Sequence, residues 1–255
     1  LIPQCGVKNR NIAHKKNITS YLDKNCNSKN LNILGEKTKK FIDTILDFNK
    51  QKKNLINVTH IKSNQNQWRN TNKISLYIDF ETINSLLLNS SSETNLNFSE
   101  DFVFMIGLGW QLPNNNDWNY KCFYCEKINF NEEYRILNDF TNKIKLLQKS
   151  YEISNVYHWS PAETTIYNKL DKRYPNVLIK LDWFDLMKFF KDNEIYILGA
   201  LNFSLKTIAT KMYEYKMINT VWNDDCTSGL DAMFKAWKYF ISNNTDKDVF
   251  KEIIK

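Results

Sequence analysis

The sequence predicts an α/β protein, in which helices flank a sheet whose first strands are antiparallel and a small helical region precedes the sheet. Apolar residues recur at helical spacing in several segments, one of them within the first sixty residues. Later in the chain, three short apolar runs follow one another with polar segments between them, which is typical of consecutive strands. A helix, a fourth strand and further helices come next, and this order of elements indicates a layered α/β fold.

The first 62 residues are expected to form a basic, helical region. A short helix is predicted over Arg10–Lys16. A clearer one is predicted over Lys37–Lys50, where apolar side chains share one face and lysines lie elsewhere. Residues 63–72 are polar, with Trp68 as their only large apolar side chain, and we interpret them as a linker. Residues 73–255 then form the main domain.

The main domain is predicted to begin with three strands, Ser75–Phe80, Phe102–Trp110 and Tyr120–Cys125. The second strand is continuously apolar, which indicates burial on both faces, and a long polar loop, Asn84–Glu100, separates it from the first. The remaining elements are expected in this order: a helix over Glu132–Ser150, a strand over Ile153–His158, and helices over Ala162–Leu170, Trp183–Phe190, Ser204–Tyr213 and Leu230–Ile241.

Net charge, cysteine content and the length of apolar runs limit the classes of protein to which this chain could belong. The chain has 255 residues and a net charge of +7, from 35 Lys plus Arg against 28 Asp plus Glu, which suits a phosphate-rich partner. The charge is spread along the chain, so an ordinary solvated surface explains it equally well. Five scattered cysteines argue against a disulfide framework and favour a reducing, intracellular compartment, either cytoplasm or nucleus. No apolar run is long enough to cross a membrane, and no secretory signal is visible.

Two acidic residues at the end of the first strand are the main candidates for chemistry. Side chains alternate along a strand, so Asp79 and Glu81 share one face while Ile78 and Phe80 face the core. Two close carboxylates repel each other unless a proton or a cation lies between them, and Mg²⁺ binds carboxylate oxygens readily. Two such ions can activate a water and stabilise the leaving oxygen in phosphodiester cleavage. The alternative is a solvated strand end at which both acids merely face water.

Several motifs, in order, resemble a known nuclease family. Asp79-Phe80-Glu81-Thr82, followed by an apolar strand, resembles the opening of the DEDD exonucleases. Three later segments are similar to the branch in which a ribonuclease H-like domain is joined to RecB/Cas4-like nucleases in bacteria and large DNA viruses. These segments are Val156–Glu163, Asp185-Leu186 and Ser204–Ala209. The resemblance covers roughly Lys73–Lys255, and the ordered set is more specific than any single motif.

The resemblance implies a ribonuclease H-like fold, a mixed sheet of three antiparallel strands followed by parallel additions. It also implies metal-dependent hydrolysis of DNA or RNA, typically from 3′ to 5′ on single strands, with two Mg²⁺ or Mn²⁺ ions. In such a site Asp79, Glu81 and Glu163 would hold the metal ions. The residues Thr82 and Lys206 would contact the nucleic acid.

Glu163 has two interpretations. The resemblance places it as the second-motif acid, facing the metals from a helix start, although many relatives carry Asp there. Yet Ser160-Pro161-Ala162-Glu163 also has the pattern of a capping box, with Ser160 as N-cap and Pro161 as the first helical residue. A capping Glu163 would bind the Ser160 amide and need no metal.

Three further candidates also have ordinary explanations. His158, at the end of the fourth strand, could contact a substrate phosphate or orient water, but a lone His beside a Trp is more often structural. Asp185 could approach the site from a helix start, or simply cap that helix. Lys206 could pair with a phosphate, and an exposed lysine explains it as well; Ser204, before it, is a predicted N-cap.

The fourth acid of the DEDD pattern is not visible. The chain begins at Leu1 and ends within an apparently helical stretch, Val249–Lys255, where the last helix of the family would begin. We therefore expect the fourth acid to lie just beyond Lys255, and the chain alone to bind metal weakly and cleave poorly. Asp246 and Asp248 are unlikely substitutes. RecB/Cas4-like and helicase-like parts of a longer polypeptide are the partner domains that the resemblance implies.

Two other segments each have a functional and a structural interpretation. Cys122 and Cys125 have the spacing of half a zinc site, but no second pair accompanies them, and buried small apolar side chains are the better interpretation. The segment Cys5–Asp23 resembles the helix-hairpin-like region that precedes the nuclease domain in the same branch. Such a turn can hold a phosphate through backbone amides, or serve as a helical spacer.

Two rival functions remain open at this point. The domain could be a catalytically inactive ribonuclease H-like module that only binds nucleic acid, as the missing fourth acid and Glu163 favour. It could also be a structural interaction domain with no nucleic-acid role, against which salt-dependent binding of single-stranded DNA would argue.

Overall fold

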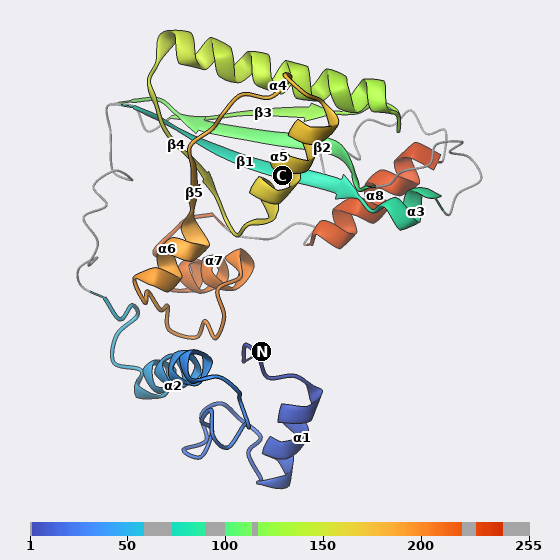
Figure 1. Cartoon of the computed structure of the whole chain (residues 1–255). Helices are drawn as coiled ribbons and strands as arrows, with labels where there is room; N and C mark the ends of the chain where they lie inside the picture. The colour runs from blue at the N-terminus through green and yellow to red at the C-terminus, as the bar shows by residue number, and fades with distance from the viewer. Residues whose placement is uncertain (1, 59–72, 90–99, 114–116, 221–227, 242–255) are drawn as a thin grey trace. The chain divides into compact units, whose positions relative to one another are not determined.

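The computed structural model describes residues 2–58, 73–89, 100–113, 117–220 and 228–241 (Figure 1). Residue contacts divide the chain into two compact units. The first unit consists of residues 1–64 and 187–222, and the second of residues 65–186 and 223–255. The chain therefore enters the second unit, returns to the first and enters the second once more. The prediction of a single division at the linker, residues 63–72, was wrong in this respect. The whole of that linker lies outside the described residues.

The second unit is built on a five-stranded mixed sheet of order β3-β2-β1-β4-β5. The strands β1 (Ile74–Ile83), β2 (Phe102–Gln111) and β3 (Trp118–Tyr124) pair antiparallel. The strands β4 (Ile153–His158) and β5 (Trp183–Asp185) continue the sheet in parallel pairing beyond β1. A mixed α/β sheet that starts with three antiparallel strands and adds parallel ones is thus confirmed.

Helices α4 (Phe130–Ser150) and α5 (Ala162–Arg173) pack on one face of this sheet (Figure 1). Helix α4 begins after Asn129, whose side chain accepts a hydrogen bond from the Glu132 amide at 2.9 Å. Its apolar stripe lies at the predicted positions, and all of its members are buried: Ile136, Leu137, Phe140, Ile144 and Leu147. Phe80 of β1 packs against Phe140 of α4 and Tyr167 of α5, which fixes the face of β1 that enters the core.

Two more helices complete the described part of this unit. Helix α8 (Gly229–Ile241) packs against β1, and its Phe240 contacts Phe104 of β2 edge to face. The short helix α3 (Ser85–Asn89) lies within the segment predicted as the loop Asn84–Glu100. That prediction was wrong for residues 85–89, because Leu88 is fully buried and anchors a helical turn; residues 90–99 lie outside the described residues.

The predicted helix Trp183–Phe190 is also wrong in its first three residues. Residues 183–185 form β5, and α6 (Leu186–Asp192) follows directly. Trp183 packs on Tyr167, while Phe184 packs on Tyr157, so neighbouring side chains use opposite faces as in a strand. The parallel partner β4 supplies the hydrogen bonds that make this short strand favourable over a helical turn.

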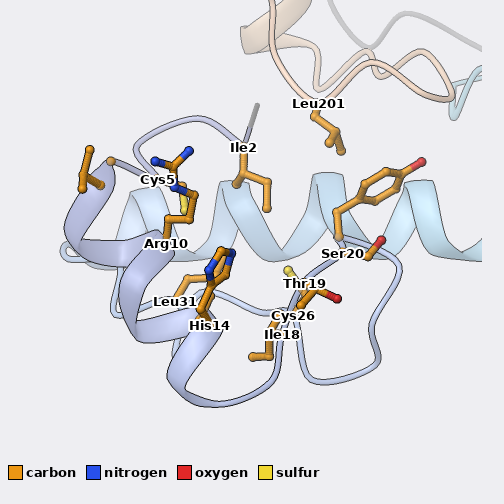
Figure 2. A pocket seen from close by; sticks show the side chains of 14 residues that line it. Ile2, Cys5, Arg10, His14, Ile18, Thr19, Ser20, Cys26, Leu31 and Leu201 are labelled. Carbon is orange, nitrogen blue, oxygen red and sulfur yellow. The ribbon is translucent and has the colours of Figure 1, made fainter.

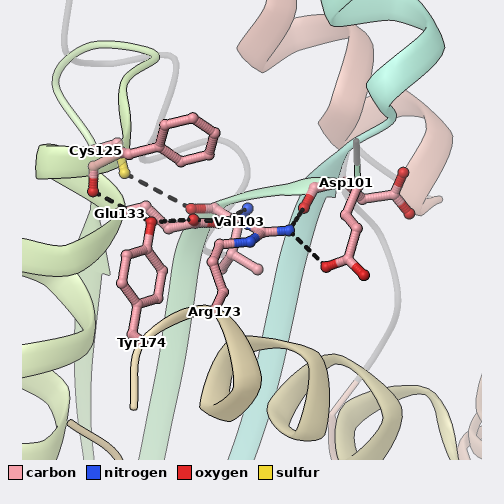
Figure 3. Close-up of polar contacts among 8 residues, drawn as sticks. Asp101, Val103, Cys125, Glu133, Arg173 and Tyr174 are labelled. Atoms are coloured by element: carbon pink, nitrogen blue, oxygen red, sulfur yellow. Dashed lines mark hydrogen bonds and ion pairs between the residues drawn. The ribbon is translucent and has the colours of Figure 1, made fainter. Parts of the chain in front are cut away.

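A buried ionic cluster joins α4, β2 and the end of α5 (Figure 3). The Glu133 side chain is fully buried and accepts a hydrogen bond from the Val103 amide at 2.7 Å. Arg173 Nη1 donates to both of its oxygens, at 2.8 and 2.7 Å, and the Tyr174 hydroxyl donates at 2.6 Å. Arg173 Nη2 continues the cluster to Glu100 at 3.0 Å. Each oxygen of this buried carboxylate thus accepts two hydrogen bonds, as a buried charge requires.

The two cysteines at β3 agree with the apolar interpretation. Cys125 is fully buried, and its thiol lies 3.7 Å from the Val103 carbonyl oxygen (Figure 3). Cys122 is half-buried on β3. Burial raises the pKa of both thiols, that of Cys122 to about 12, so neither is a reactive thiolate at neutral pH.

The first unit contains α1 (Val7–Lys15), α2 (Glu36–Gln51) and α7 (Leu205–Glu214). Its core cluster includes Ile42 and Leu46 from the predicted apolar face of α2. Helix α7 begins after Ser204, whose hydroxyl accepts from the Thr207 amide at 3.2 Å, so the predicted N-cap is confirmed. Among the described helices, none has both the length and the hydropathy that a membrane crossing needs.

Helix α1 and the turns after it line a pocket of about 440 Å³ (Figure 2). Its polar side chains include Arg10, His14, Thr19 and Ser20. Ile18, Cys26 and Leu31 belong to its apolar wall. This pocket occupies the segment that resembles a helix-hairpin. Phosphate binding there remains a prediction.

Candidate active site

Strand β1 places Asp79 and Glu81 on the same face of the sheet. Ile78 and Phe80, between and beside them, are buried on the opposite face, and regular pairing with β2 continues through Glu81. The register shifts only after Glu81, at Thr82, so the alternation that directs both acids holds along this stretch. The two carboxylates therefore leave β1 on the side away from α4 and α5.

The environment of the two acids disfavours their charged forms. Burial by the surrounding protein is the larger cause, and the nearby Glu163 charge the smaller, of a raised Asp79 pKa of about 6. A hydrogen bond from the Phe80 backbone lowers this pKa but does not cancel the rise. Burial, and then the Asp79 charge, raise the pKa of Glu81 to about 8. Solvent nevertheless reaches both carboxylates, because Asp79 is exposed and Glu81 only half-buried. At pH 7 the pair is therefore poised to give up a proton when a cation arrives.

Glu163 enters the site from the first turn of α5. The capping-box alternative is wrong, because α5 starts at Ala162 with Pro161 as N-cap and no side chain caps it. Ser160 has a left-handed backbone, with φ of +84°, and its amide donates to Asp185 Oδ1 at 3.2 Å instead of to Glu163. Glu163 Oε2 is buried and has no hydrogen-bond partner among the described residues. A buried acceptor without a donor is costly, so this oxygen is a candidate ligand atom.

His158 contacts Glu163, the Ser160 carbonyl and the Trp183 ring. Its Nδ1 donates to the Ser160 carbonyl oxygen at 2.5 Å, and its ring packs edge to face on Trp183. Glu163 Oε2 lies 3.5 Å from the same nitrogen, which is too long for a good hydrogen bond but close enough for attraction. Burial lowers the pKa of His158, but Glu163, the Ser160 carbonyl and Asp185 outweigh burial and leave this pKa raised. These contacts agree with the structural interpretation of this buried histidine.

Asp185 is the last residue of β5 and directly precedes α6, so it lies at a helix start as predicted. It pairs in register with His158 of β4, and its Oδ1 accepts the Ser160 amide. Because this contact holds the turn between β4 and α5, Asp185 acts on Glu163 through the backbone. We assign Asp185 and His158 as positioning residues for Glu163.

The predicted nucleic-acid contacts differ in position. Thr82 is half-buried on β1, one residue beyond Glu81 and just past the register shift. Lys206 lies on α7, in the first unit, whereas the acids lie in the second. The structure therefore places Thr82 beside the acids and leaves the role of Lys206 a prediction.

The chemistry of the three acids suits divalent cations. Carboxylate oxygens are the ligands that Mg²⁺ and Mn²⁺ prefer, and Glu163 Oε2 is a buried oxygen without a donor among the described residues. However, the described residues contain no group of three or more His, Cys, Asp or Glu side chains arranged to hold a metal ion. The carboxylate oxygens thus suit a hard divalent cation in their chemistry alone. Asp246 and Asp248 lie outside the described residues.

Sequence reasoning missed Tyr120. The Tyr120 hydroxyl lies across β2 above Gly107, where a Cβ atom would come within 2.8 Å of it. Gly107 pairs with Asp79, so this hydroxyl points toward the acids. Burial, Cys122, Asp79 and Glu81 all raise the pKa of Tyr120, which keeps it a neutral hydrogen-bond donor. The available signal was the pair of glycines on an otherwise apolar strand, which marks a close approach from a neighbour.

Replacing Glu81 by Gln should stabilise the protein at pH 8 in the absence of divalent cations. The pKa of Glu81 is raised in the folded state, so its contribution is present at low pH and is lost as pH rises toward about 8. Gln imitates the protonated form at every pH. We expect a gain of about 1–2 kcal/mol at pH 8, smaller than a fully buried charge would give because solvent screens this half-buried group, shrinking toward pH 4.5. Urea unfolding at a series of pH values measures it, and a less stable variant at pH 8 would contradict the assignment.

Comparison with known proteins adds no assignment, because no protein-family model, curated protein or solved structure matches this chain.

Proposed function

We propose that the second unit carries a divalent-cation-dependent nuclease site that hydrolyses phosphodiester bonds in DNA or RNA, from the 3′ end of single strands. The observation that carries the proposal is the buried Glu163 oxygen, which accepts no hydrogen bond among the described residues and lies near Asp79, whose pKa Glu163 raises. Asp79 and Glu81 carry costly charges, because burial and neighbouring acids raise both pKa values, and Glu163 has His158 3.5 Å away as its basic neighbour. The three acids are explained best by a cation that binds between them.

The sheet supports the same proposal. Its three antiparallel strands followed by two parallel ones are the arrangement that the resemblance to the DEDD exonucleases implies. The acid pair lies on β1, the central strand, and the third acid follows the parallel strand β4. A ribonuclease H-like fold is therefore part of the proposal.

The residues of the chain would divide the work as follows. Bound Mg²⁺ or Mn²⁺ ions supply an activated water and stabilise charge on the leaving oxygen. Asp79 and Glu81 would hold the cations, Glu81 after losing the proton that it keeps at pH 7, and Glu163 would contribute the oxygen that accepts no hydrogen bond among the described residues. His158 and Asp185 hold the turn that carries Glu163, so they position this oxygen without touching the substrate.

Cation binding and cleavage are tested separately on the chain. Isothermal titration with Mn²⁺ should show binding that releases protons, because the raised pKa values of Asp79 and Glu81 leave protons to displace. A 5′-labelled single-stranded oligonucleotide should be shortened from its 3′ end with Mn²⁺ or Mg²⁺ and remain intact with EDTA. Absence of Mn²⁺ binding, or equal cleavage in EDTA, would refute the proposal.

A second function is favoured by the lack of a preassembled three-ligand group in the described part of the chain. In it, the unit binds single-stranded nucleic acid without cleaving it. Salt-dependent oligonucleotide binding, with no cleavage in either Mg²⁺ or Mn²⁺, is the result that would select this function.

A further inference from the structure

Four aromatic rings form a row across the sheet on the face that carries Asp79 and Glu81. Trp118 of β3 contacts Tyr77 of β1 with ring centroids 5.0 Å apart, and Tyr77 stacks on Tyr157 of β4 at 5.3 Å. Phe184 of β5 ends the row, 5.4 Å from Tyr157. Tyr77 precedes Asp79 by two residues, so it shares the face of Asp79 about 7 Å along the strand.

Two glycines let rings from β3 cross β2 and lie over the sheet. A Cβ atom on Gly109 would come within 2.3 Å of the Trp118 ring, and one on Gly107 within 2.8 Å of the Tyr120 hydroxyl. Any larger residue at these positions would displace the rings. Gly109 pairs with Tyr77, and Gly107 with Asp79, so the two rings lean toward β1 and the acids.

The open end of the row is large and accessible. Trp118 is 57% exposed and Tyr120 is 44% exposed, whereas Tyr157 is buried and anchors the row from within. A single exposed aromatic side chain is ordinary. Here Trp118 lies over Gly109 and contacts Tyr77 of the row, while Tyr120 lies over Gly107, the partner of Asp79, so the two exposed rings form a surface suited to a flat ligand.

We propose that Trp118 and Tyr120 form a platform on which bases of a single-stranded nucleic acid stack while its phosphate reaches the carboxylates. This inference rests on the proposed function, since the acids beside the platform are what select a nucleic acid as its occupant. Every base has a π-face, so stacking on exposed rings is tolerant of sequence. Bases inside a duplex have both faces covered by their neighbours, so the platform selects single strands.

The test measures binding in EDTA, where cleavage is suppressed. Fluorescence anisotropy of labelled oligothymidylate of about 12 nucleotides, within the usual site size of single-strand binders, is compared with a duplex of equal length. Trp118→Leu and Tyr120→Leu are each expected to weaken single-strand binding by about tenfold. Trp118→Phe, which keeps an aromatic face, should retain most of the affinity. Tyr151→Leu, which changes an exposed aromatic residue at the end of α4, is the matched control and should change nothing.

The outcomes separate this inference from the proposed function. If cation-dependent cleavage is present but both leucine variants bind single strands like the parent, the platform is refuted and the nuclease stands. If cleavage is absent but Trp118→Leu loses single-strand affinity while its melting curve matches the parent, the platform stands and the nuclease fails. Equal loss of single-strand and duplex affinity would also overturn the platform, because stacking requires an accessible base face.

Discussion

Replacing Asp79 by Asn is expected to lower cation-dependent cleavage by a factor on the order of 10²–10³, while the protein remains folded. Asn has the size of Asp but lacks the negative charge that holds a divalent cation. The pKa of Asp79 is raised by the surrounding protein and by Glu163, so the charge of Asp79 destabilises the fold, and the proposed cation would offset this cost. The same variant should therefore be no less stable than the parent at pH 8 in EDTA.

Lower cleavage with unchanged stability would distinguish a site residue from a structural residue. The measurements are kcat/KM on a labelled single strand and the midpoint of urea unfolding, each made for parent and variant. Asp139→Asn is the matched control, because Asp139 is an exposed acid on α4 that pairs with Arg135 at 3.5 Å, away from the site. Retention of parental kcat/KM in Asp79→Asn would exclude this residue from catalysis. If instead Asp79→Asn lowers the urea midpoint so far that unfolding accounts for the lost activity, Asp79 has a structural role.

The largest loss of stability is expected from Glu133→Ala. The Glu133 carboxylate has no solvent exposure and accepts hydrogen bonds from Val103, Arg173 and Tyr174 (Figure 3). Without it, the mostly buried Arg173 guanidinium loses its main counter-charge, and the Val103 amide loses its acceptor. Breaking a buried ion pair by removing one partner costs about 3–5 kcal/mol. The free energy of unfolding in urea measures this loss.

The neighbouring residue provides the control. Glu132 pairs with Arg135 at 2.8 Å, and the Arg135 side chain is 45% exposed. Such surface pairs contribute about 0–1 kcal/mol, so Glu132→Ala should have a much smaller effect. The double variant Glu133→Met with Arg173→Met removes both charges and should recover part of the stability that Glu133→Ala loses. Equal effects at positions 132 and 133 would show that the buried cluster adds nothing to the fold.

Local periodicity was sufficient for most of the second unit. The spacing of apolar residues located α4, and alternation located β1 and β4, because each pattern depends only on residues a few positions apart. The same alternation predicted that Asp79 and Glu81 leave β1 together, and pairing with β2 agrees. The antiparallel start of the sheet and the shared face of the two acids were therefore predictable from local patterns, whereas the parallel additions were expected only from the resemblance.

The features that the sequence did not reveal all depend on partners far along the chain. Residues 183–185 form a strand only because β4 lies beside them, and Glu133 is a buried acceptor only because Arg173, forty residues later, reaches it. The capping role of Glu163 was excluded by the Ser160 turn, because the Ser160 amide that a capping Glu163 would need binds Asp185 instead. Sequence alone thus determined which residues alternate and which elements form. Tertiary packing decided which polar atoms find partners, because a hydrogen bond across the fold is not recorded in local spacing.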